Sequence, residues 1–236
     1  MNRTRSIALI AVFAALTAVL DALPGLPQLS SGVWYGWTFV AIPLAGIVLG
    51  PWEAFLSVLI GVMISHTVFL FDPYEYFFTI GAPLGAMTSS LIFRGRPRPV
   101  LPYYVVLLGA YFVSPAAWNL PVWALWDTYI AFAVLLLVVL FKGRLYGLGG
   151  GKFTFALSAL IGLEADILFR VFLFVPVGTY EWLYGFSLDF VRSVWMVSAF
   201  ITPIQVGIAL FTTSLAGRVL QKATDVPRTY PEYTRA

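Results

Sequence analysis

Long apolar runs separated by short breaks dominate this chain. The breaks contain proline, glycine or charged residues, which end helices or form turns, and most runs approach the roughly 20 residues of a membrane-crossing helix. None shows the alternation of a membrane β-barrel, so we expect an all-α bundle. The run at 101–141 would be about 60 Å long as one helix, too long for one crossing, and Ser114-Pro115 and 119–121 divide it. Eight crossings are predicted, at about 7–20, 34–49, 52–71, 76–93, 101–141 (two crossings), 153–175 and 193–216.

The composition is that of an integral membrane protein. Hydrophobic residues make up 60% of the chain and charged residues 11%, and the mean hydropathy is +0.89, far outside soluble usage. We expect a multi-pass protein of the cell membrane, with 1–222 as one transmembrane helical domain and 223–236 as a polar cytoplasmic tail. Cysteine is absent and His66 is the single histidine. Disulfides, zinc-thiolate sites and sites with two imidazoles are therefore excluded, and no metal or cofactor is expected.

The charges outside the apolar runs divide by sign. If the N-terminus is cytoplasmic, eight crossings put every basic cluster and both termini on the cytoplasmic side, as the positive-inside rule requires. This orientation explains the pI of about 9.2 without nucleic acid as a partner. The basic clusters are Arg3/Arg5, Arg94/Arg96/Arg98, Lys142/Arg144/Lys152 and Arg218/Lys222, and the acids expected on the outer side are Asp21, Asp72, Glu75, Glu181 and Asp189.

The run at 153–175 carries Glu164, Asp166 and Arg170 near its middle. Inserting each charge into lipid costs roughly 2.5 kcal/mol or more. Asp166 and Arg170 are spaced i, i+4 and can neutralise each other, whereas Glu164 points about 200° away from Asp166 and needs another partner. Two interpretations remain open: an internal ion pair that fixes helix packing, or a polar cavity that binds a solute.

Polar residues on other helices favour the cavity. Three of them are expected about five to seven residues from the outer ends of their helices, and another starts the last helix from outside. This shared depth predicts an outward-facing pocket. Tryptophans at the outer ends fit an interfacial belt, or the aromatic walls of a site for a planar ligand. The predicted solute-binding residues are Glu164, Asp166, Arg170, Asp127, His66, Arg192, Trp34, Trp123 and Trp126.

Small residues recur every four positions on the early helices. Such stripes allow close helix contact in lipid, either within one chain or against another membrane subunit. The stripe that contains 81, 85 and 89 marks a contact face of the fourth crossing. The residues predicted to dock a partner are Ala11, Ala15, Ser57 and Gly61.

Two motifs point to other functions. GGGKFT at 149–154 ends like a nucleotide-binding loop, but Tyr146 and Phe153 occupy the positions that require glycine and Ser or Thr. If the protein needs ATP, another chain must supply it. ADILFRVFLF at 165–174 resembles the acid-then-arginine helix of the CPBP intramembrane proteases, but no histidine follows it to act as a base. No catalytic residue is predicted. An intramembrane enzyme remains one alternative, and a channel or scaffold remains another.

The first hundred residues resemble the substrate-binding S components of energy-coupling factor (ECF) transporters. The likeness lies in RTRSIALIAVFAALTAVL, a long outer loop, IPLAGIVLGPWEAFLSVLIGVMIS and the run that closes at RGR, and in the last helix, TPIQVGIALFTTSLAGRVLQKA. The resemblance implies capture of a vitamin-like solute outside and docking through Ala11 and Ala15 on a transmembrane coupling subunit driven by cytoplasmic ATPases. It makes 21–32 a candidate lid. That family has six helices, so spans five and six would be an inserted pair. An organic solute is favoured because the histidine-bearing segment of the metal-transporting members is absent.

Overall fold

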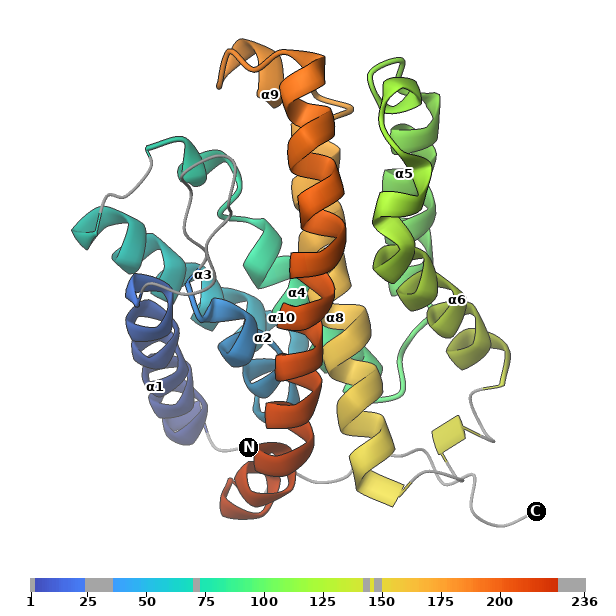
Figure 1. Ribbon diagram of the computed structural model, residues 1–236. Coiled ribbons are helices and arrows are strands. Elements are labelled where there is room, and N and C mark those ends of the chain that lie inside the picture. Colours follow the sequence, from blue (N-terminus) through green and yellow to red (C-terminus); the bar gives the residue numbers. More distant parts are fainter. Residues whose placement is uncertain (1–2, 24–35, 70–72, 142–144, 147–149, 225–236) are drawn as a thin grey trace.

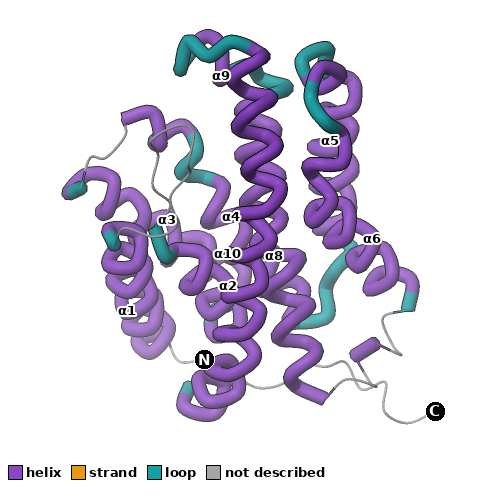
Figure 2. The backbone as a smooth tube through the Cα atoms, in the orientation of Figure 1, coloured by secondary structure: helices purple, strands orange, loops and turns teal. Residues whose placement is uncertain are grey.

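The computed structural model describes residues 3–23, 36–69, 73–141, 145–146 and 150–224, and every regular element in these ranges is helical (Figures 1 and 2). Short helical turns connect the longer helices at Pro73–Phe77, Ala117–Asn119, Val122–Leu125 and Thr179–Trp182, the last of which is α9. The longer helices are α1 (Arg3–Ala22), α2 (Thr38–Val48), α3 (Pro51–Val68), α4 (Gly81–Phe93), α5 (Val100–Val113), α6 (Trp126–Leu140), α8 (Gly150–Phe174) and α10 (Leu188–Ala223).

Four helical segments of the described chain are long and apolar enough to cross a membrane: α1, α3, Val122–Leu140 and α10. Helices α2, α4 and α5 are apolar but shorter, and α8 has 25 residues, which include the central charges. The expected all-α bundle with membrane-crossing helices is confirmed to this extent. The predicted break in 101–141 is also confirmed, because α5 ends at Val113 and α6 begins at Trp126.

Helix α8 lies at the centre of the bundle, with α10 beside it (Figure 1). Its buried residues contribute to four apolar clusters, the smallest of which joins Phe155 to Ile47 and Phe93. Leu163 packs in the cluster built by α1 to α4, Ile161 and Leu168 pack with α5 and α6, and Val171 packs with α9 and α10. One helix therefore connects all parts of the bundle, and a side chain on α8 meets neighbours from several elements.

Helices α4 and α8 cross at small residues. A Cβ on Gly162 would lie 2.8 Å from the Gly85 carbonyl oxygen and closer still to Ser89 Oγ. At the same crossing Ser89 Oγ donates to the Ser158 carbonyl (3.0 Å) and Ser158 Oγ donates to the Ser89 carbonyl (2.6 Å). The small-residue stripe predicted on the fourth crossing is thus an internal contact face, of the kind that lets helix backbones approach closely in lipid.

Helix α2 packs against the other side of α4. A Cβ on Gly46 would lie 2.5 Å from Ser89 Cβ and 2.8 Å from the Ala86 carbonyl oxygen, so the two backbones are again close. Helix α2 has 11 residues, and all of them except the half-buried Val40 are buried. At about 1.5 Å per residue it is roughly 17 Å long, much shorter than a bilayer core. It is therefore an internal wall of the bundle, with one end beside α1.

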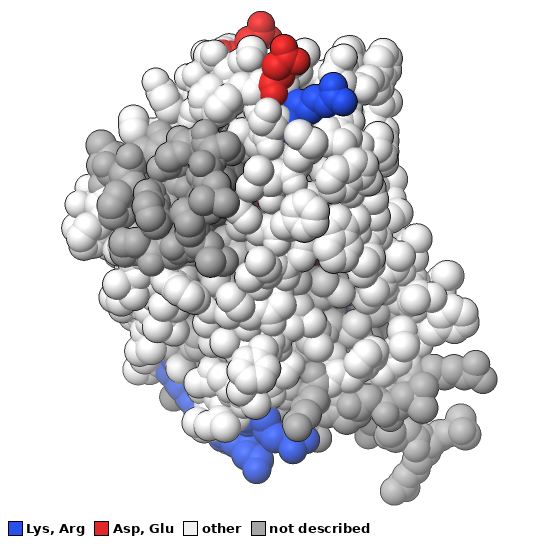
Figure 3. All heavy atoms as spheres, in the orientation of Figure 1, with Lys and Arg blue, Asp and Glu red and all other residues white. Residues whose placement is uncertain are grey.

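The two ends of the bundle differ in charge. Arg5 Nη2 donates to the Thr224 carbonyl (2.6 Å), so α1 begins at the end where α10 finishes. Figure 3 shows Lys and Arg side chains gathered at that end, and Asp and Glu side chains at the opposite end, where α9 lies, with basic charge beside them. This asymmetry agrees with the division of charges in the sequence.

The crossing of α4 and α8 leads to a stability prediction. We expect Gly162→Ala to lower the free energy of unfolding by about 1 to 3 kcal/mol, because the added methyl overlaps Ser89 and the Gly85 backbone. Gly207→Ala in α10 is the matched control, since nothing lies within 4 Å of its added Cβ. The control should be neutral or more stable by up to about 1 kcal/mol. Unfolding in mixed detergent would measure both, and equal stability of the two variants would contradict the close crossing.

Candidate functional site

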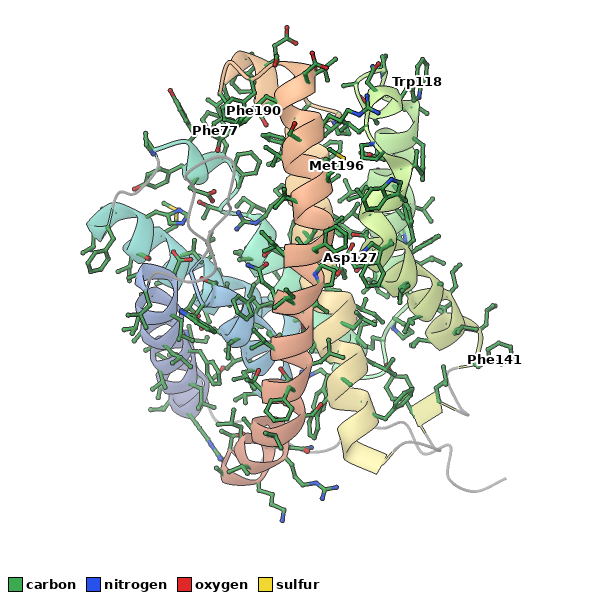
Figure 4. The ribbon with its side chains drawn as sticks, viewed as in Figure 1. Phe77, Trp118, Asp127, Phe141, Phe190 and Met196 are labelled. Atoms are coloured by element: carbon green, nitrogen blue, oxygen red, sulfur yellow. The ribbon has the colours of Figure 1, made fainter. Side chains whose placement is uncertain are left out.

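A cavity of about 210 Å³ lies between α8 and α10, in the half of the bundle nearer α9. Its volume is far above the roughly 10 to 15 Å³ that one water molecule needs, so it has room for an organic molecule. The ends of α1 and α3, the start of α2 and the segment before α6 complete the wall. Figure 4 shows Asp127, one of the lining residues, in the middle of the bundle beside α10.

The two long walls of the cavity are single helix faces. Residues spaced three or four apart share one face of a helix, and both lining sets follow that spacing. The α8 wall mixes aliphatic residues with two charged side chains, and the α10 wall places small polar residues between apolar ones. The α8 wall consists of Leu163, Asp166, Ile167, Arg170, Val171 and Phe174, and the α10 wall of Val194, Trp195, Ser198, Thr202, Gln205 and Val206.

Arg170 joins two carboxylates at the cavity. Its Nε lies 3.0 Å from Asp166 Oδ1, one turn earlier on α8, and its Nη1 lies 3.1 Å from Glu75 Oε2. Glu75 comes from the short helix before α4, 95 residues away in sequence. The guanidinium suits this role because it is always charged and presents several donors in a fixed plane. The predicted pair of Asp166 and Arg170 is therefore part of a three-residue cluster.

His66 forms a second charged contact on the wall. Its Nε2 lies 3.3 Å from Asp21 Oδ2, and its Nδ1 lies 3.2 Å from Thr79 Oγ1. Asp21 also accepts a hydrogen bond from Thr38 Oγ1 (2.5 Å). These bonds tie the end of α1 to the start of α2 and the last turn of α3. His66 thus has partners on both ring nitrogens, and it orients Asp21 at the cavity.

Asp127 is the acid on the α6 side. It is 5% exposed, and its Oδ2 accepts a hydrogen bond from Thr202 Oγ1 on α10 (2.6 Å). Its Oδ1 accepts from the backbone N–H of Thr128 (2.9 Å). Both donors are neutral groups, and the two hydrogen bonds hold the carboxyl group of Asp127 in place.

Glu164 is fully buried between α8 and α6 and lies outside the cavity wall. Thr128 Oγ1 donates to its Oε2 at 2.8 Å, whereas its Oε1 has no hydrogen-bond partner among the described residues. The sequence places Glu164 on the opposite face from Asp166, and the structure agrees. Its partner is the hydroxyl of Thr128, next to Asp127, so Glu164 supports the α6 side of the site from behind.

The aromatic residues of the wall differ from those expected. Phe174 and Trp195 stack with ring centres 6.3 Å apart, and Tyr184 and Phe186 stack at 5.2 Å. These rings form a continuous aromatic surface in the part of the cavity near α9. All seven aromatic residues of the wall were missed as site residues in the sequence: Phe39, Phe69, Phe78, Phe174, Tyr184, Phe186 and Trp195.

Three residues expected in the pocket need correction or lie outside the described ranges. Arg192 is exposed because Val191, Val194 and Trp195 form the inward face of α10 and leave position 192 outside. Trp123 is 52% exposed, with its ring 6.4 Å from that of the equally outward Phe200. Neither lines the cavity. Trp34 and positions 24–32 of the candidate lid lie outside the described residues.

Trp126 does not line the cavity and instead forms a hydrogen bond to the backbone of α10. Its indole Nε1 donates to the Ala199 carbonyl at 2.9 Å. That carbonyl lies four residues before Pro203, which interrupts α10 by having no N–H to donate. Trp126 therefore satisfies an acceptor that the proline leaves free. This corrects its sequence-based assignment to the pocket.

The residues expected to dock a partner lie in two different environments. Ala11 and Ala15 are exposed on α1. Ser57 and Gly61 are buried against α1: Ser57 Oγ donates to the Ile10 carbonyl (2.9 Å), and a Cβ on Gly61 would lie 2.5 Å from the Ala14 carbonyl oxygen. The stripe on α3 is therefore an internal contact, which corrects its assignment as an outer docking surface.

Several important site residues were not identified in the sequence as ligand contacts. Asp21 and Glu75 were assigned to outer loops on the basis of charge alone. Thr202 and Gln205 lie on α10, and with Ser198 they share one helical face, a pattern that could have identified them. Among the described residues no group of three or more metal-ligating side chains comes together.

Comparisons of the chain with models of known protein families, with curated proteins and with solved structures find no match. Function therefore has to be inferred from the cavity and from the helices that surround it.

The contact between Trp126 and Ala199 leads to a second prediction. Trp126→Phe should lower the free energy of unfolding by about 1 to 3 kcal/mol, because a buried carbonyl loses its donor. Pro203→Ala supplies a backbone N–H that can bond the same carbonyl. The double variant should therefore lose less stability than the two single changes combined. A double-mutant cycle in detergent measures this coupling, and strictly additive effects would show that the proline does not create the need for Trp126.

Proposed function

We propose that this chain is the solute-capture subunit of an uptake transporter in the cell membrane. It crosses the membrane eight times with both termini in the cytoplasm, and it binds a vitamin-like organic solute in an outward-facing cavity. A separate ATP-driven module supplies the energy. The observation that carries this proposal is the cavity of about 210 Å³, whose wall contains ionisable and aromatic side chains inside a mostly apolar bundle.

The energetics of buried charge support a binding role. Ionisable groups in membrane helices are costly and usually mark solute or ion pathways. An ion pair kept only for stability can be replaced by apolar residues with little loss, and it needs no adjacent space. Here Asp166 and Arg170 border a cavity, and Asp127 faces the same space from α6. A solute that fills the cavity gives these groups a reason to be retained.

The orientation follows from the charges at the two ends. Basic residues are retained on the cytoplasmic side, so the end that carries Arg5 and Lys222 is assigned to the cytoplasm. The cavity lies in the opposite half, toward α9 and the acidic end. This arrangement allows a solute to bind from outside, as capture before transport requires.

The partner is a transmembrane coupling subunit with cytoplasmic ATPases. No nucleotide-binding loop is recognised in the sequence, so ATP must act through another chain. Helix α1 leaves Ala11 and Ala15 exposed, in line with the sequence resemblance to ECF S components. The same helix exposes a set of large apolar side chains to lipid or to a partner: Ile7, Val12, Leu16 and Val19.

A cavity-filling variant tests solute capture. Ser198 lines the cavity on α10, and Met196, two residues earlier, is exposed on the outside. We expect native mass spectrometry to find a small molecule retained by the purified protein, and Ser198→Phe to abolish its retention by occupying the space. Met196→Phe, the matched control, should retain the molecule at the wild-type level. A folded Ser198→Phe protein that retains the same molecule would rule out this cavity as the binding site.

A second pair of variants tests docking through α1. Ala15→Trp should leave the isolated protein folded and able to bind its solute, because the bulk projects outward, but it should prevent co-purification with a coexpressed coupling subunit. Ala14→Trp is the contrasting variant, since Ala14 is buried against α3 and overpacking should destabilise the fold. Normal assembly of the Ala15→Trp protein would remove α1 as the docking surface.

A further inference from the structure

The cavity wall has an excess of negative charge. Four carboxylates line it, against one guanidinium and one imidazole. The printed sequence adds no lysine or arginine between Ala22 and Gly36, the stretch that joins two wall elements. The residues concerned are Asp21, Glu75, Asp127 and Asp166 on the acidic side, and Arg170 and His66 on the basic side.

This excess is not evenly distributed over the wall. Arg170 is shared between Asp166 and Glu75, and His66 faces Asp21. Only Asp127 among the four acids has no arginine or histidine side chain as a partner in the described structure, and its hydrogen bonds come from a hydroxyl and a backbone N–H. An isolated carboxylate in an apolar surrounding carries a large desolvation penalty unless a positive group joins it. The α6 side of the cavity is therefore the part that a cation would complete.

A second polar group lies on the same side without a partner. Gln205 is 7% exposed and lines the cavity on α10, one turn after Thr202, which holds Asp127. Its amide Nε2 has no hydrogen-bond partner among the described residues. Buried donors in native proteins are rarely left unpaired. A ligand with an acceptor atom close to its positive group would satisfy Gln205 and Asp127 together.

The remaining wall indicates the body of the ligand. Phe174 and Trp195 stack in parallel, 6.3 Å apart and 6° from coplanar, and Phe186 and Tyr184 extend the surface. Flat aromatic walls favour a planar ring, and they also attract positive charge through their π faces. An anionic solute gains nothing from this surface and meets four carboxylates.

We infer that the cavity takes an organic cation: a planar, nitrogen-containing molecule whose protonated amine or amidinium pairs with Asp127 and whose acceptor atom faces Gln205. This inference rests on the proposed role of the cavity as a solute site and adds the charge class of the solute. It also assigns different roles to the two polar regions of the wall, one around Arg170 and the other around Asp127. The cluster around Arg170 is already paired within the chain and forms one polar part of the wall, and Asp127 with Gln205 makes the contacts that recognise the ligand.

Three probes of equal shape but different charge test the inference. Benzamidine is a cation at neutral pH, benzamide is neutral and benzoate is an anion. We expect benzamidine to raise the unfolding temperature of the purified protein in detergent and to bind at least ten-fold more tightly than benzamide or benzoate. Binding of either of the latter as strongly as benzamidine, or binding of none of the three, would overturn the inference.

Variants then locate the contact. Asp127→Asn keeps the shape and can still accept from Thr202, so it should fold and lower benzamidine affinity at least ten-fold. Gln205→Met should lower it several-fold, which gives a second measurement if Asp127→Asn is unstable. Asp189→Asn, at an exposed acid outside the cavity, is the control and should bind like wild type. Unchanged benzamidine affinity in both cavity variants would overturn the assignment.

The retained molecule separates this inference from the proposed function. If native mass spectrometry identifies a neutral or anionic solute that Ser198→Phe excludes, the capture function stands and the cation inference fails. If no molecule is retained and Ser198→Phe binds benzamidine like wild type, the cavity is not the solute site, and both proposals fail. A retained cation that Asp127→Asn releases supports both.

Discussion

The charge on Arg170 constrains the half of the bundle that lies nearer α9. A guanidinium cannot lose its proton in a protein, so burial near the middle of an apolar fold requires carboxylates from nearby elements. Asp166 comes from the same helix, and Glu75 comes from the segment before α4. These two contacts fix the rotation of α8 and bring a connecting segment onto the cavity. The wall of the site therefore depends on the pairing of one cation.

Close packing between α4 and the same face of α8, one turn before Asp166, makes this arrangement possible. The Gly162 and Gly85 backbones approach until no side chain fits between them, and paired serine hydroxyls lock the crossing. A Cβ on Gly81 would also lie very close to Asp166 Oδ1. The glycines thus leave room for the carboxylate that Arg170 requires. In lipid, where apolar surface gives little drive for helix contact, such small-residue contacts hold the bundle together.

The sequence allowed prediction of the helices because apolar runs and proline breaks are local signals, and the charges of α8 stood out for the same reason. Predictions from the sequence were wrong for residues whose orientation depends on contacts with other helices. Arg192 has the right depth but the wrong helical face, and Trp126 serves a carbonyl freed by Pro203, a relation that no linear pattern reveals. Asp21 and Glu75 looked like loop charges because their partners lie far away in sequence.

Stability alone does not explain Asp127. A membrane bundle gains nothing from a buried carboxylate held only by neutral donors, since an apolar side chain of similar size would avoid the desolvation penalty. Thr202 and Thr128 nevertheless orient both of its oxygens, and Thr128 also binds Glu164 behind it. Such preorganisation lowers the cost of binding, because the polar groups are already in position before a ligand arrives. The α6 side of the cavity therefore offers oriented polar groups to the ligand that we propose, whereas the polar groups on the Arg170 side are already paired within the chain.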